Sequence, residues 1–581
     1  MASPTLRDDL AGFFDAAWYR SEYPDVAGAG IDPLDHFINH GAGENRNPNP
    51  FFDSTWYLGQ YPDVARAGIH PLLHYLQHGA KELRNPHPRF DATYYAEEHP
   101  EGAGNPLLHH VLFGVERGWA TEKRIEIGEY LPSAAEPLPC PPGIEVDVVI
   151  PVYRGVTQTR RCLESVLADP HRPPGRIVVV DDRSPEQEVS AWLDRVNATG
   201  RIKLVRNRRN LGFVASVNRG MQLSGTADVA LLNSDTVVPP GWLRRLAGHA
   251  YAERRVASVS PFSNNATICS YPHEQGGPMP MGLSVDEMDA ACREANGGRS
   301  VEVPTTVGFC MYIRRDALRD IGLFDAATFG RGYGEENDFC MRAAARGWQH
   351  RLACDTFVYH EGKVSFGAGS TDLDGKADLL AARHPDFAEL VARHVRRDKV
   401  GPYRFALTAA LFRRSGLPTV LQISHGLGGG VLQHIDAVTK SVGSRANLLS
   451  LSSHSRGVAL TLPGQPDHPS MVLGEDRQED LVLFLRSAGV SRVHVHHLLG
   501  MRIEPRELIA QLGVPFDFTV HDYFAICPQI NLLPQRDSQE CGSPGPATPA
   551  TPVSPNATRP ARATSCRGAP RTAGFSARRS E

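Results

Sequence analysis

Acidic side chains stand at the ends of predicted strands in the middle of the chain. Four apolar residues at 177–180 precede Asp181 and Asp182, and another acid, Asp235, follows a later apolar run. The carboxyl ends of the strands in a parallel α/β sheet line one crevice, where ligands bind. Two adjacent aspartates repel each other unless a ligand or a hydrogen-bond donor offsets their charge. One of them could cap the next helix, and the other could accept a hydrogen bond from the imide N–H of uracil or thymine.

The segment Asn233-Ser234-Asp235 directly follows the apolar residues 229–232. An acid just after a buried strand is suited to a hard cation, and a cation there can bridge two phosphates. A turn would explain these three residues equally well in isolation, but their position after Asp182 favours the metal. The pattern therefore predicts a site for a nucleotide diphosphate and a divalent metal ion.

A third acidic group, at 335–338, follows two glycines and opens a predicted helix. Acidic residues in the first turn stabilise a helix through its dipole. The adjacent glutamates Glu335 and Glu336 exceed what capping needs, and a carboxylate in a cleft is a suitable general base. His360 ends a later predicted strand. An isolated histidine is usually structural. This one ends the first predicted strand after the acidic group, so it could lie at the same edge of the sheet.

Alternating strands and helices from Glu145 onward predict a parallel sheet that positions these groups. No Gly-x-Gly-x-x-Gly follows the first strand, which argues against a dinucleotide site. The basic glycine-rich loop of a sugar nucleotidyltransferase is also missing. Tyr153, at the end of the first strand, could stack on a base or simply pack. The predicted strands span 146–152, 176–181, 201–206, 227–233 and 256–260, and the predicted helices span 157–168, 186–197, 211–223 and 240–250.

The ordered set of motifs from Val146 to about Gly367 resembles the glycosyltransferases of family 2, which have the Rossmann-like GT-A fold. The resemblance implies inverting transfer of a sugar from a UDP- or dTDP-linked donor to a hydroxyl of a glycan or lipid-linked acceptor. It also implies a divalent metal, Mn²⁺ or Mg²⁺, and an imidazole among the ligands suits Mn²⁺ better. We expect a role in the biosynthesis of polysaccharide for the cell envelope.

The resemblance also implies a role for each matching residue. Asn233 stands where the family's Asp-x-Asp motif begins with Asp, which weakens the ribose or metal contact expected there. Glu336 stands where the family has its catalytic base, usually Asp; because Glu is one methylene longer, Glu335 could equally be the base. The other expected roles are nucleobase binding by Pro151, Tyr153 and Asp182, metal binding by Asp235 and His360, and contacts with the donor sugar or acceptor by Gly308, Phe309 and Asp338.

A repeat precedes this region, over residues 1–128. Phe14-Asp15 recurs as Phe52-Asp53 and as Phe90-Asp91, a constant step of 38 residues. Each unit is predicted to hold two short helices, the first capped by its aspartate. We interpret the recurring aromatics and histidines as packing residues; a carbohydrate- or partner-binding surface of exposed Trp and Tyr is the alternative. The repeats resemble short helical repeats that accompany bacterial glycosyltransferases, and a proline-rich linker at 129–144 follows them.

A second α/β unit is predicted over 417–541, after the family 2 region at 145–400. A strand at 419–425 and the glycine-rich residues 426–430 could cradle a phosphate or simply form a tight turn. His521-Asp522-Tyr523-Phe524 and Cys527-Pro528 resemble the N-terminal half of a family 4 glycosyltransferase with the GT-B fold. In that family the C-terminal half supplies most of the donor site, and it is missing here. We therefore expect this partial unit to be inactive alone.

Two further features belong to the C-terminal part. Three histidines, His494, His496 and His497, could bind a metal, but strand alternation would split them between two faces. Residues 542–581 contain almost no aliphatic side chain and cannot form a core, so a disordered tail is predicted. We interpret this tail as a premature end, from a frameshift or a truncation.

Bulk properties restrict the class of protein. A chain of 581 residues is too long for one hydrophobic core. The net charge of -4 does not indicate a basic surface for binding nucleic acid. No apolar run reaches the roughly 20 residues that span a bilayer. The first residues show no basic stretch followed by an apolar one, so we expect no signal peptide. Ten scattered cysteines suit a reducing cytosol rather than a zinc or disulfide framework. We expect a cytoplasmic protein, which a lipid-linked acceptor could bring to the inner face of the membrane.

Two other functions are alternatives to sugar transfer. The first is a catalytically inactive carbohydrate-binding or scaffolding protein of a glycan assembly system. The intact set of Asp182, Asp235, Glu336 and His360 counts against it. The second is a nucleotidyltransferase, which the missing glycine-rich loop disfavours.

Overall fold

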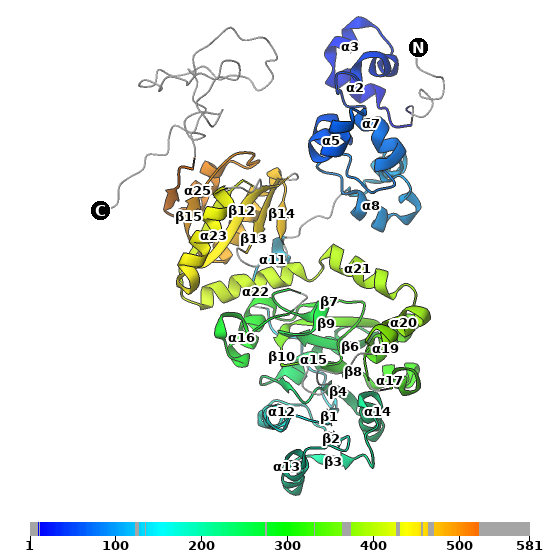
Figure 1. Ribbon diagram of the computed structural model, residues 1–581, viewed down its shortest axis with the longest axis vertical. Helices are drawn as coiled ribbons and strands as arrows, with labels where there is room; N and C mark the ends of the chain where they lie inside the picture. The colour runs from blue at the N-terminus through cyan, green and yellow to red at the C-terminus, as the bar shows by residue number, and fades with distance from the viewer. Residues whose placement is uncertain are drawn as a thin grey trace, which may run out of the picture.

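The chain forms a helical region, a central α/β region and a smaller C-terminal α/β region, drawn in blue, cyan to green, and yellow to orange (Figure 1). The computed structural model describes residues 10, 12–121, 127–133, 135–273, 276–330, 332–362, 373–425, 430–454, 457–462 and 470–521. Three predicted features lie outside the described residues: most of the glycine-rich turn (426–429), the motif residues 522–528 and the tail at 542–581.

Each N-terminal repeat opens with a helix capped by its aspartate. Asp15, Asp53 and Asp91 accept backbone N–H hydrogen bonds at 2.8–3.1 Å, which confirms the predicted caps. The expectation of two helices per repeat is wrong, because prolines at two later positions each start a further helical segment, the last of which runs on into a π turn. The helices are α2 (Ala16–Glu22), α3 (Pro24–Ala29) and α4 (Pro33–His36), then α5 (Ser54–Gln60), α6 (Pro62–Ala67) and α7 (Pro71–His74), then α8 (Ala92–Glu98), η3 (Pro100–Gly102) and α9 (Pro106–His109).

One buried tyrosine anchors each repeat. The hydroxyl groups of Tyr19, Tyr57 and Tyr95 lie 3.0–3.2 Å from Nδ1 of the histidine that ends the third helix, His36, His74 or His109. All three tyrosine side chains are fully buried. At these positions the recurring aromatics and histidines pack inside the repeat, as the packing interpretation expects.

A glycine in the second repeat gives a test of this packing. Gly79 ends the π turn η2 (Tyr75–Gly79), and a Cβ there would overlap the hydroxyl of Tyr57. We expect Gly79→Ala to break the hydrogen bond from Tyr57 to His74 and to lower the free energy of unfolding by about 1–3 kcal/mol. Chemical denaturation measures the loss. Gly59→Ala is the matched control, since Gly59 lies in α5 with open space around its Cα, and it should be neutral or stabilising.

The central region is built on an eight-stranded sheet with strand order β3-β2-β1-β4-β8-β6-β9-β7. Four strands at one side, β1 to β4, run parallel and are separated by helices, as predicted. The strands are β1 (Val146–Val152), β2 (Ile177–Asp181), β3 (Lys203–Arg206), β4 (Asp228–Leu232), β6 (Val256–Phe262), β7 (Ser300–Glu302), β8 (Cys310–Ile313) and β9 (Gln349–Phe357).

The sheet is mixed, so the expectation of a purely parallel sheet is wrong. β8 runs antiparallel to both β4 and β6, and β7 runs antiparallel to β9. β7 and β8 therefore run in the same direction, opposite to β4, β6 and β9, and no helix separates them along the chain. The reversal matters for function because the residues that precede β8 thereby lie at the carboxyl end of β4.

Helices cover both faces of this sheet, which explains why β1, β2 and β4 are buried along their whole length. Val148 and Ile150 of β1 face one side, and Val149 faces the other. The first side is covered by α12 (Val156–Ala168), α13 (Gln187–Ala198), α15 (Trp242–Ala252) and α16 (Val285–Asn296). The other side is covered by α14 (Phe213–Leu223), α17 (Arg315–Ile321), α18 (Ala326–Phe329) and α19 (Glu335–Ala344).

The C-terminal region is a second α/β sheet, with strand order β14-β13-β12-β11-β15-β16. β12, β11, β15 and β16 are parallel, and β13 and β14 are antiparallel additions at one edge. The elements are β11 (Thr419–Ser424), α23 (Gly430–Val442), β12 (Asn447–His454), β13 (Gly457–Thr461), β14 (Met471–Leu473), α24 (Gln478–Ser487), β15 (Val490–Val495), α25 (Pro505–Leu512) and β16 (Phe516–Phe518). The structure supports an α/β fold here and does not distinguish a GT-B half domain from other α/β sheets.

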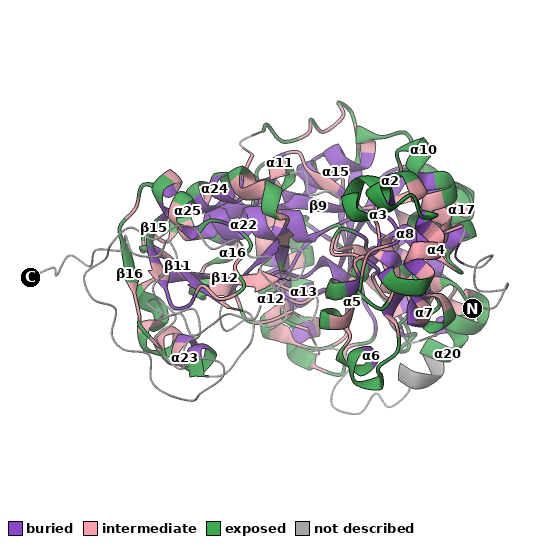
Figure 2. Ribbon diagram, turned by 90° about the horizontal axis from the view of Figure 1, so that it is seen from above, coloured by how far each residue is buried: buried purple, intermediate pink, exposed green. Residues whose placement is uncertain are grey.

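A long helix, α22 (Gly401–Arg414), lies between the two sheets (Figure 1). It follows α20 (Leu373–Arg383) and α21 (Phe387–Arg397). Leu407 and Leu411 pack into the central core, whereas Phe405 packs into the C-terminal core. Buried residues accordingly run through β9, α22 and α24 in Figure 2.

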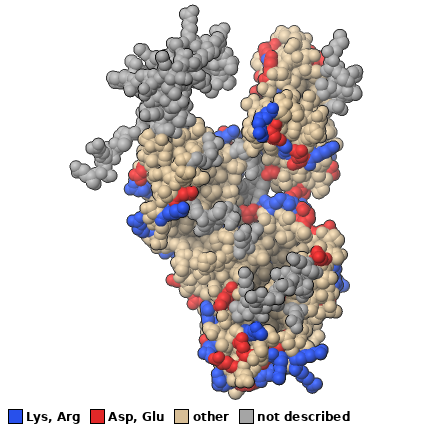
Figure 3. Space-filling model, in the orientation of Figure 1, with Lys and Arg blue, Asp and Glu red and all other residues tan. Residues whose placement is uncertain are grey.

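The surface carries charges of both signs. Acidic and basic side chains are interspersed over the face drawn in Figure 3, in line with the small net charge of the chain. Within the described ranges, every helix is too short or too polar to cross a membrane.

Candidate active site

A two-stranded ribbon beside the central sheet holds Asp235 and His360 together. Its strands, β5 (Thr236–Val237) and β10 (Tyr359–His360), pair antiparallel and join the end of β4 to the chain after β9. Oδ1 of Asp235 lies 3.5 Å from Nε2 of His360, and Oδ2 accepts a hydrogen bond from the Gly362 N–H at 3.1 Å. The ribbon thus brings a carboxylate and an imidazole from distant segments to one place.

The imidazole of His360 has a fixed orientation. Its Nδ1 lies 2.6 Å from the carbonyl oxygen of Asn265, and because a carbonyl only accepts, Nδ1 carries a proton and Nε2 faces Asp235. The ring of Phe309 stacks on the imidazole at 5.2 Å. Burial alone would lower the pKa of His360, but the Asp235 carboxylate and the Asn265 carbonyl outweigh burial and raise it.

The segment Gly308-Phe309, just before β8, connects this pair to the acidic helix α19. The Phe309 carbonyl accepts a hydrogen bond from the Asn233 N–H at 2.8 Å. A Cβ on Gly308 would lie 3.9 Å from Cγ and Cδ of Glu336. Asn233, Asp235, His360 and Glu336 therefore lie around one short stretch of backbone, so the structure brings these four candidate residues together.

Glu336 lies in the first turn of α19, directly beside Gly308. Gly334 caps this helix with φ of 95°, a backbone conformation that favours glycine, and it thereby sets where the acidic turn begins. Oε2 of Glu336 is buried and has no hydrogen-bond partner among the described residues. Burial raises the pKa of Glu336 against the opposing effect of backbone N–H groups at Glu336 and Gly334. Glu335, one position earlier, is also buried.

A buried carboxylate of this kind costs stability, and the cost depends on pH. The pKa of Glu336 is higher in the folded than in the unfolded chain, so the folded state disfavours the ionised form. The penalty is absent below the unfolded pKa and complete above the folded one. We expect Glu336→Gln to raise the free energy of unfolding by about 1 kcal/mol at pH 8 and to change nothing near pH 4. Melting temperatures at both pH values test this, and a gain of equal size at pH 4 would contradict it.

Asp338 lies in the same turn but has different contacts. Its carboxylate is fully buried, with Oδ2 at 2.7 Å from Nε of Arg342 and Oδ1 at 3.0 Å from Nε2 of His384. Nε of Arg383 lies 3.1 Å from the same Oδ1. These ion pairs tie α19 to α20 and the residues after it, so the structure does not bring Asp338 to Gly308 as it brings Glu336.

Directly after β2, Asp182 organises a loop. Its Oδ1 accepts hydrogen bonds from the side chain of Asn207 and the N–H of Leu211, and its Oδ2 accepts from the N–H of Gly212, all at 2.7–2.8 Å. Gly212 is the N-cap of α14. Asp182 therefore fixes the entry to α14, and its exposed fraction is 4%.

Hydrogen-bond donors offset the charge of the adjacent Asp181, as expected for a pair of neighbouring acids. Asp181 accepts from the N–H of Ser184 at 2.8 Å and pairs with Arg206 at 3.0 Å. The expectation that one of the two aspartates caps the next helix is wrong. The chain runs on to Glu186, the N-cap of α13, before the helix begins, and Asp181 contacts the first turn only through the hydroxyl of Ser190, at 3.4 Å.

Pro151 and Tyr153 lie at the end of β1. Pro151 is buried in register with Val180 of β2. Tyr153 is half-buried just past the strand, with the guanidinium of Arg154 5.4 Å from its ring centre. Both positions border Asp182, whose N–H donates to the carbonyl of Val152 at 2.8 Å.

Two asparagines beside His360 were not predicted from the sequence. Asn264 accepts from the His360 N–H and donates to the His360 carbonyl, both at 2.9 Å, and Asn265 orients the His360 ring. They follow β6, whose carboxyl end opens on the same edge as those of β1, β2 and β4. Polar residues at the end of the fifth predicted strand were thus the available signal.

Comparisons with known proteins agree with this arrangement. Residues 147–322 match the family model described as glycosyl transferase family 2. This segment is a family 2 glycosyltransferase domain. The expectation of a GT-A domain of family 2 is confirmed for this part of the chain, which holds β1 to β8 and the residues Asp182, Asn233, Asp235, Gly308 and Phe309.

The similarity to curated relatives and to solved structures extends over more of the chain than residues 147–322. The chain is 29% identical over 272 residues to proteins named pre-mycofactocin glycosyltransferase from two strains of Mycobacterium tuberculosis, which covers 46% of this chain and 54% of each relative. It thus spans about half the length of the curated relatives it matches. Among solved structures, GalNAc-T7 with UDP, GalNAc and Mn²⁺ matches at 17% identity, with a TM-score of 0.31, over 42% of this chain and 51% of that one. The mannosyltransferase PcManGT of Pyrobaculum calidifontis, with GDP-Man and Mn²⁺, matches at 15% identity, with a TM-score of 0.31, over 55% and 84%.

Proposed function

We propose that this protein is an inverting glycosyltransferase that moves a sugar from a nucleotide-diphosphate donor to a hydroxyl of a glycan or lipid-linked acceptor. The observation that carries the proposal is the meeting of three groups at Gly308-Phe309: the Asp235–His360 pair, the backbone of Asn233 and the carboxylate of Glu336. The family 2 match over residues 147–322 supports the same chemistry.

The pair Asp235–His360 fits a divalent metal. His360 uses Nδ1 to hold the Asn265 carbonyl, which leaves Nε2 directed at the same space as a carboxylate oxygen. A backbone carbonyl that accepts a hydrogen bond from the other ring nitrogen orients metal-binding histidines in many proteins. One nitrogen and one oxygen ligand suit Mn²⁺ better than Mg²⁺, which prefers oxygen and water. A metal bound there would neutralise charge on the leaving diphosphate.

Glu336 is proposed as the general base. Its Oε2 lacks a partner among the described side chains and backbone groups, so it can accept the proton of an acceptor hydroxyl. The acceptor oxygen then attacks the anomeric carbon from the face opposite the leaving diphosphate, and the configuration inverts. Glu335 is the alternative base. For Asp338 we propose a positioning role, since its ion pairs hold the helix that carries Glu336.

Pro151, Tyr153 and Asp182 are proposed to bind a uracil or thymine base, and Asn233 the ribose. Asp182 accepts three hydrogen bonds from the loop 207–212, which leaves room for one more donor at its two oxygens. The imide N–H of the base would be that donor. A base bound in this way would therefore contact the same carboxylate that holds the loop 207–212 in place.

The remaining assignments concern the whole chain. We assign sugar transfer to residues 145–400 and propose that the repeats at 1–128, joined by the linker at 129–144, and the α/β unit at 417–541 support it. Synthesis of cell-envelope polysaccharide at the cytoplasmic side of the membrane is the process we propose. The relatives are named for glycosyl transfer, which supports this class of reaction.

A panel of nucleotide sugars tests the proposal. Purified full-length protein is incubated with UDP-, dTDP- and GDP-linked sugars, with and without Mn²⁺, and binding and release of nucleoside diphosphate are measured. We expect metal-dependent binding of a UDP- or dTDP-sugar. Absence of binding to every donor under both conditions would contradict sugar transfer and favour a scaffolding protein.

A further inference from the structure

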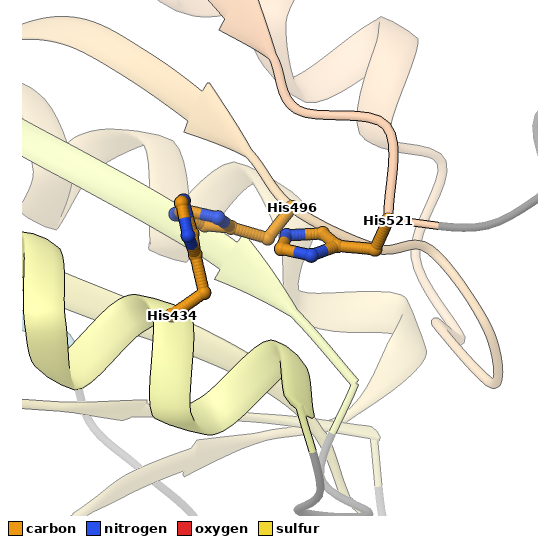
Figure 4. A group of neighbouring side chains, drawn as sticks. All are labelled: His434, His496 and His521. Atoms are coloured by element: carbon orange, nitrogen blue, oxygen red, sulfur yellow. The ribbon is translucent and has the colours of Figure 1, made fainter.

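A cluster of three histidines lies in the C-terminal region, away from the site above. His434 projects from α23, His496 follows β15 and His521 follows β16. One ring nitrogen from each lies within 4.8 Å of the other two, and the three rings point toward one another (Figure 4). Three elements that are distant in sequence therefore bring their imidazoles to a single point.

His496 is the buried centre of this cluster. Its exposed fraction is 1%, and both of its ring nitrogens are buried without a hydrogen-bond partner among the described residues. An imidazole buried in this way loses its hydrogen bonds to water and gains none from the protein, which costs free energy. A ligand that accepts a lone pair from the ring would remove this cost.

The neighbour His494 does not supply that partner. Its ring lies 3.9 Å from the ring of His496, but its Nε2 is 2.8 Å from the hydroxyl of Thr519. Both ring nitrogens of His496 therefore stay without a protein partner in the described part of the chain.

The cluster also has the position of a ligand site in an open α/β sheet. β11 lies between β12 and β15, and the chain leaves it through α23 toward β12, whereas β15 and β16 lie on its other side. Ligands bind outside the carboxyl ends of the strands at such a reversal of strand order. His434, His496 and His521 all lie at this edge.

We propose that His434, His496 and His521 bind one divalent transition-metal ion, with Zn²⁺ as the best match. Imidazole suits Zn²⁺, Cu²⁺ and Ni²⁺, whereas Mg²⁺ and Mn²⁺ favour oxygen ligands. Three histidines leave the fourth position of a tetrahedral zinc site to water or another ligand. The site is distinct in chemistry from the Asp235–His360 pair, and the ion would tie β16, the edge strand, to β15 and α23.

The site differs from the one that the sequence suggested. Strand alternation does split His494, His496 and His497, as expected: the ring of His497 pairs instead with His425 at 4.7 Å. Only His496 of that group joins the cluster, and the other two members come from separate elements.

Cobalt substitution tests the proposal. The full chain carrying Asp235→Asn, which removes the other metal candidate, is titrated with Co²⁺ and then with Zn²⁺ in the presence of a chromophoric chelator. We expect a tetrahedral Co²⁺ absorption band at one equivalent, displaced by Zn²⁺. His434→Gln and His521→Gln should each weaken Zn²⁺ binding by at least about 100-fold. His497→Gln is the matched control and should bind Zn²⁺ like the parent.

Absence of the Co²⁺ band in the parent chain would overturn the proposal, whatever the variants do. Equal Zn²⁺ affinity in the His434→Gln variant and the parent would overturn it as well. His434 is half-buried on a largely exposed helix, so its replacement should leave the fold intact, and the melting temperature measured without metal checks this.

Discussion

Glu336→Gln is expected to lower the turnover number for sugar transfer by about 10²–10⁴-fold and to leave donor affinity unchanged. The amide keeps the volume of the carboxylate beside Gly308 but cannot take a proton from the acceptor hydroxyl. Single-turnover rates with the donor found in the panel, together with calorimetric dissociation constants, separate the two effects. Combined with the gain in stability at pH 8 expected above, the same variant would show that the buried charge serves the reaction at the cost of the fold.

Glu335→Gln is the matched control, since it removes the neighbouring carboxylate from the same helical turn. It should lose far less turnover than Glu336→Gln. The opposite order would make Glu335 the base. If neither change affects transfer, the proposed assignment of the base is wrong.

Asp235→Asn is expected to weaken donor binding in the presence of Mn²⁺ by on the order of 100-fold and to abolish the difference between affinities with and without metal. Asparagine can still accept the hydrogen bond from Gly362, so the loop after β10 keeps one of its contacts. What is lost is the negative charge beside His360. Donor titrations with and without Mn²⁺ measure the effect.

Ser234→Ala is the control for this position, because it alters the adjacent buried residue and keeps the carboxylate. It should retain metal-dependent binding. Metal-dependent binding of normal strength in Asp235→Asn would contradict the assignment of Asp235 as a metal ligand.

Most of the parallel half of the central sheet could be predicted because β1, β2 and β4 are nearly continuous apolar runs. β1 begins and ends at the predicted residues, and β2 and β4 lie within one residue of the predicted bounds. The direction of β8 could not be predicted in the same way. A short buried strand has the same apolar pattern in either orientation, and its direction depends on its pairing with β4 and β6, which lie far away in the sequence.

The residues of the candidate site could likewise be predicted only in part. The rule that polar residues at strand ends share one crevice was enough to select Asp182, Asn233 and Asp235. It could not separate Glu336 from Asp338, which lie in one acidic turn. The difference comes from Arg342, Arg383 and His384, which pair with Asp338. Arg383 ends α20 and His384 follows it, about 45 residues further along the chain than Asp338.

Truncation of the chain has to take α22 into account. Arg404 of this helix donates to the carbonyls of Ser270 and Ile268 in the central region, and on the opposite side Phe405 packs against Phe484 of the C-terminal region. A fragment that stops before β11 would keep the helix but leave Phe405 in water, and a fragment that stops before the helix would uncover the central core at Leu407. The central α/β region therefore has no boundary on this side that covers its core without exposing Phe405, and an excised central region would need a solubilising change at Phe405.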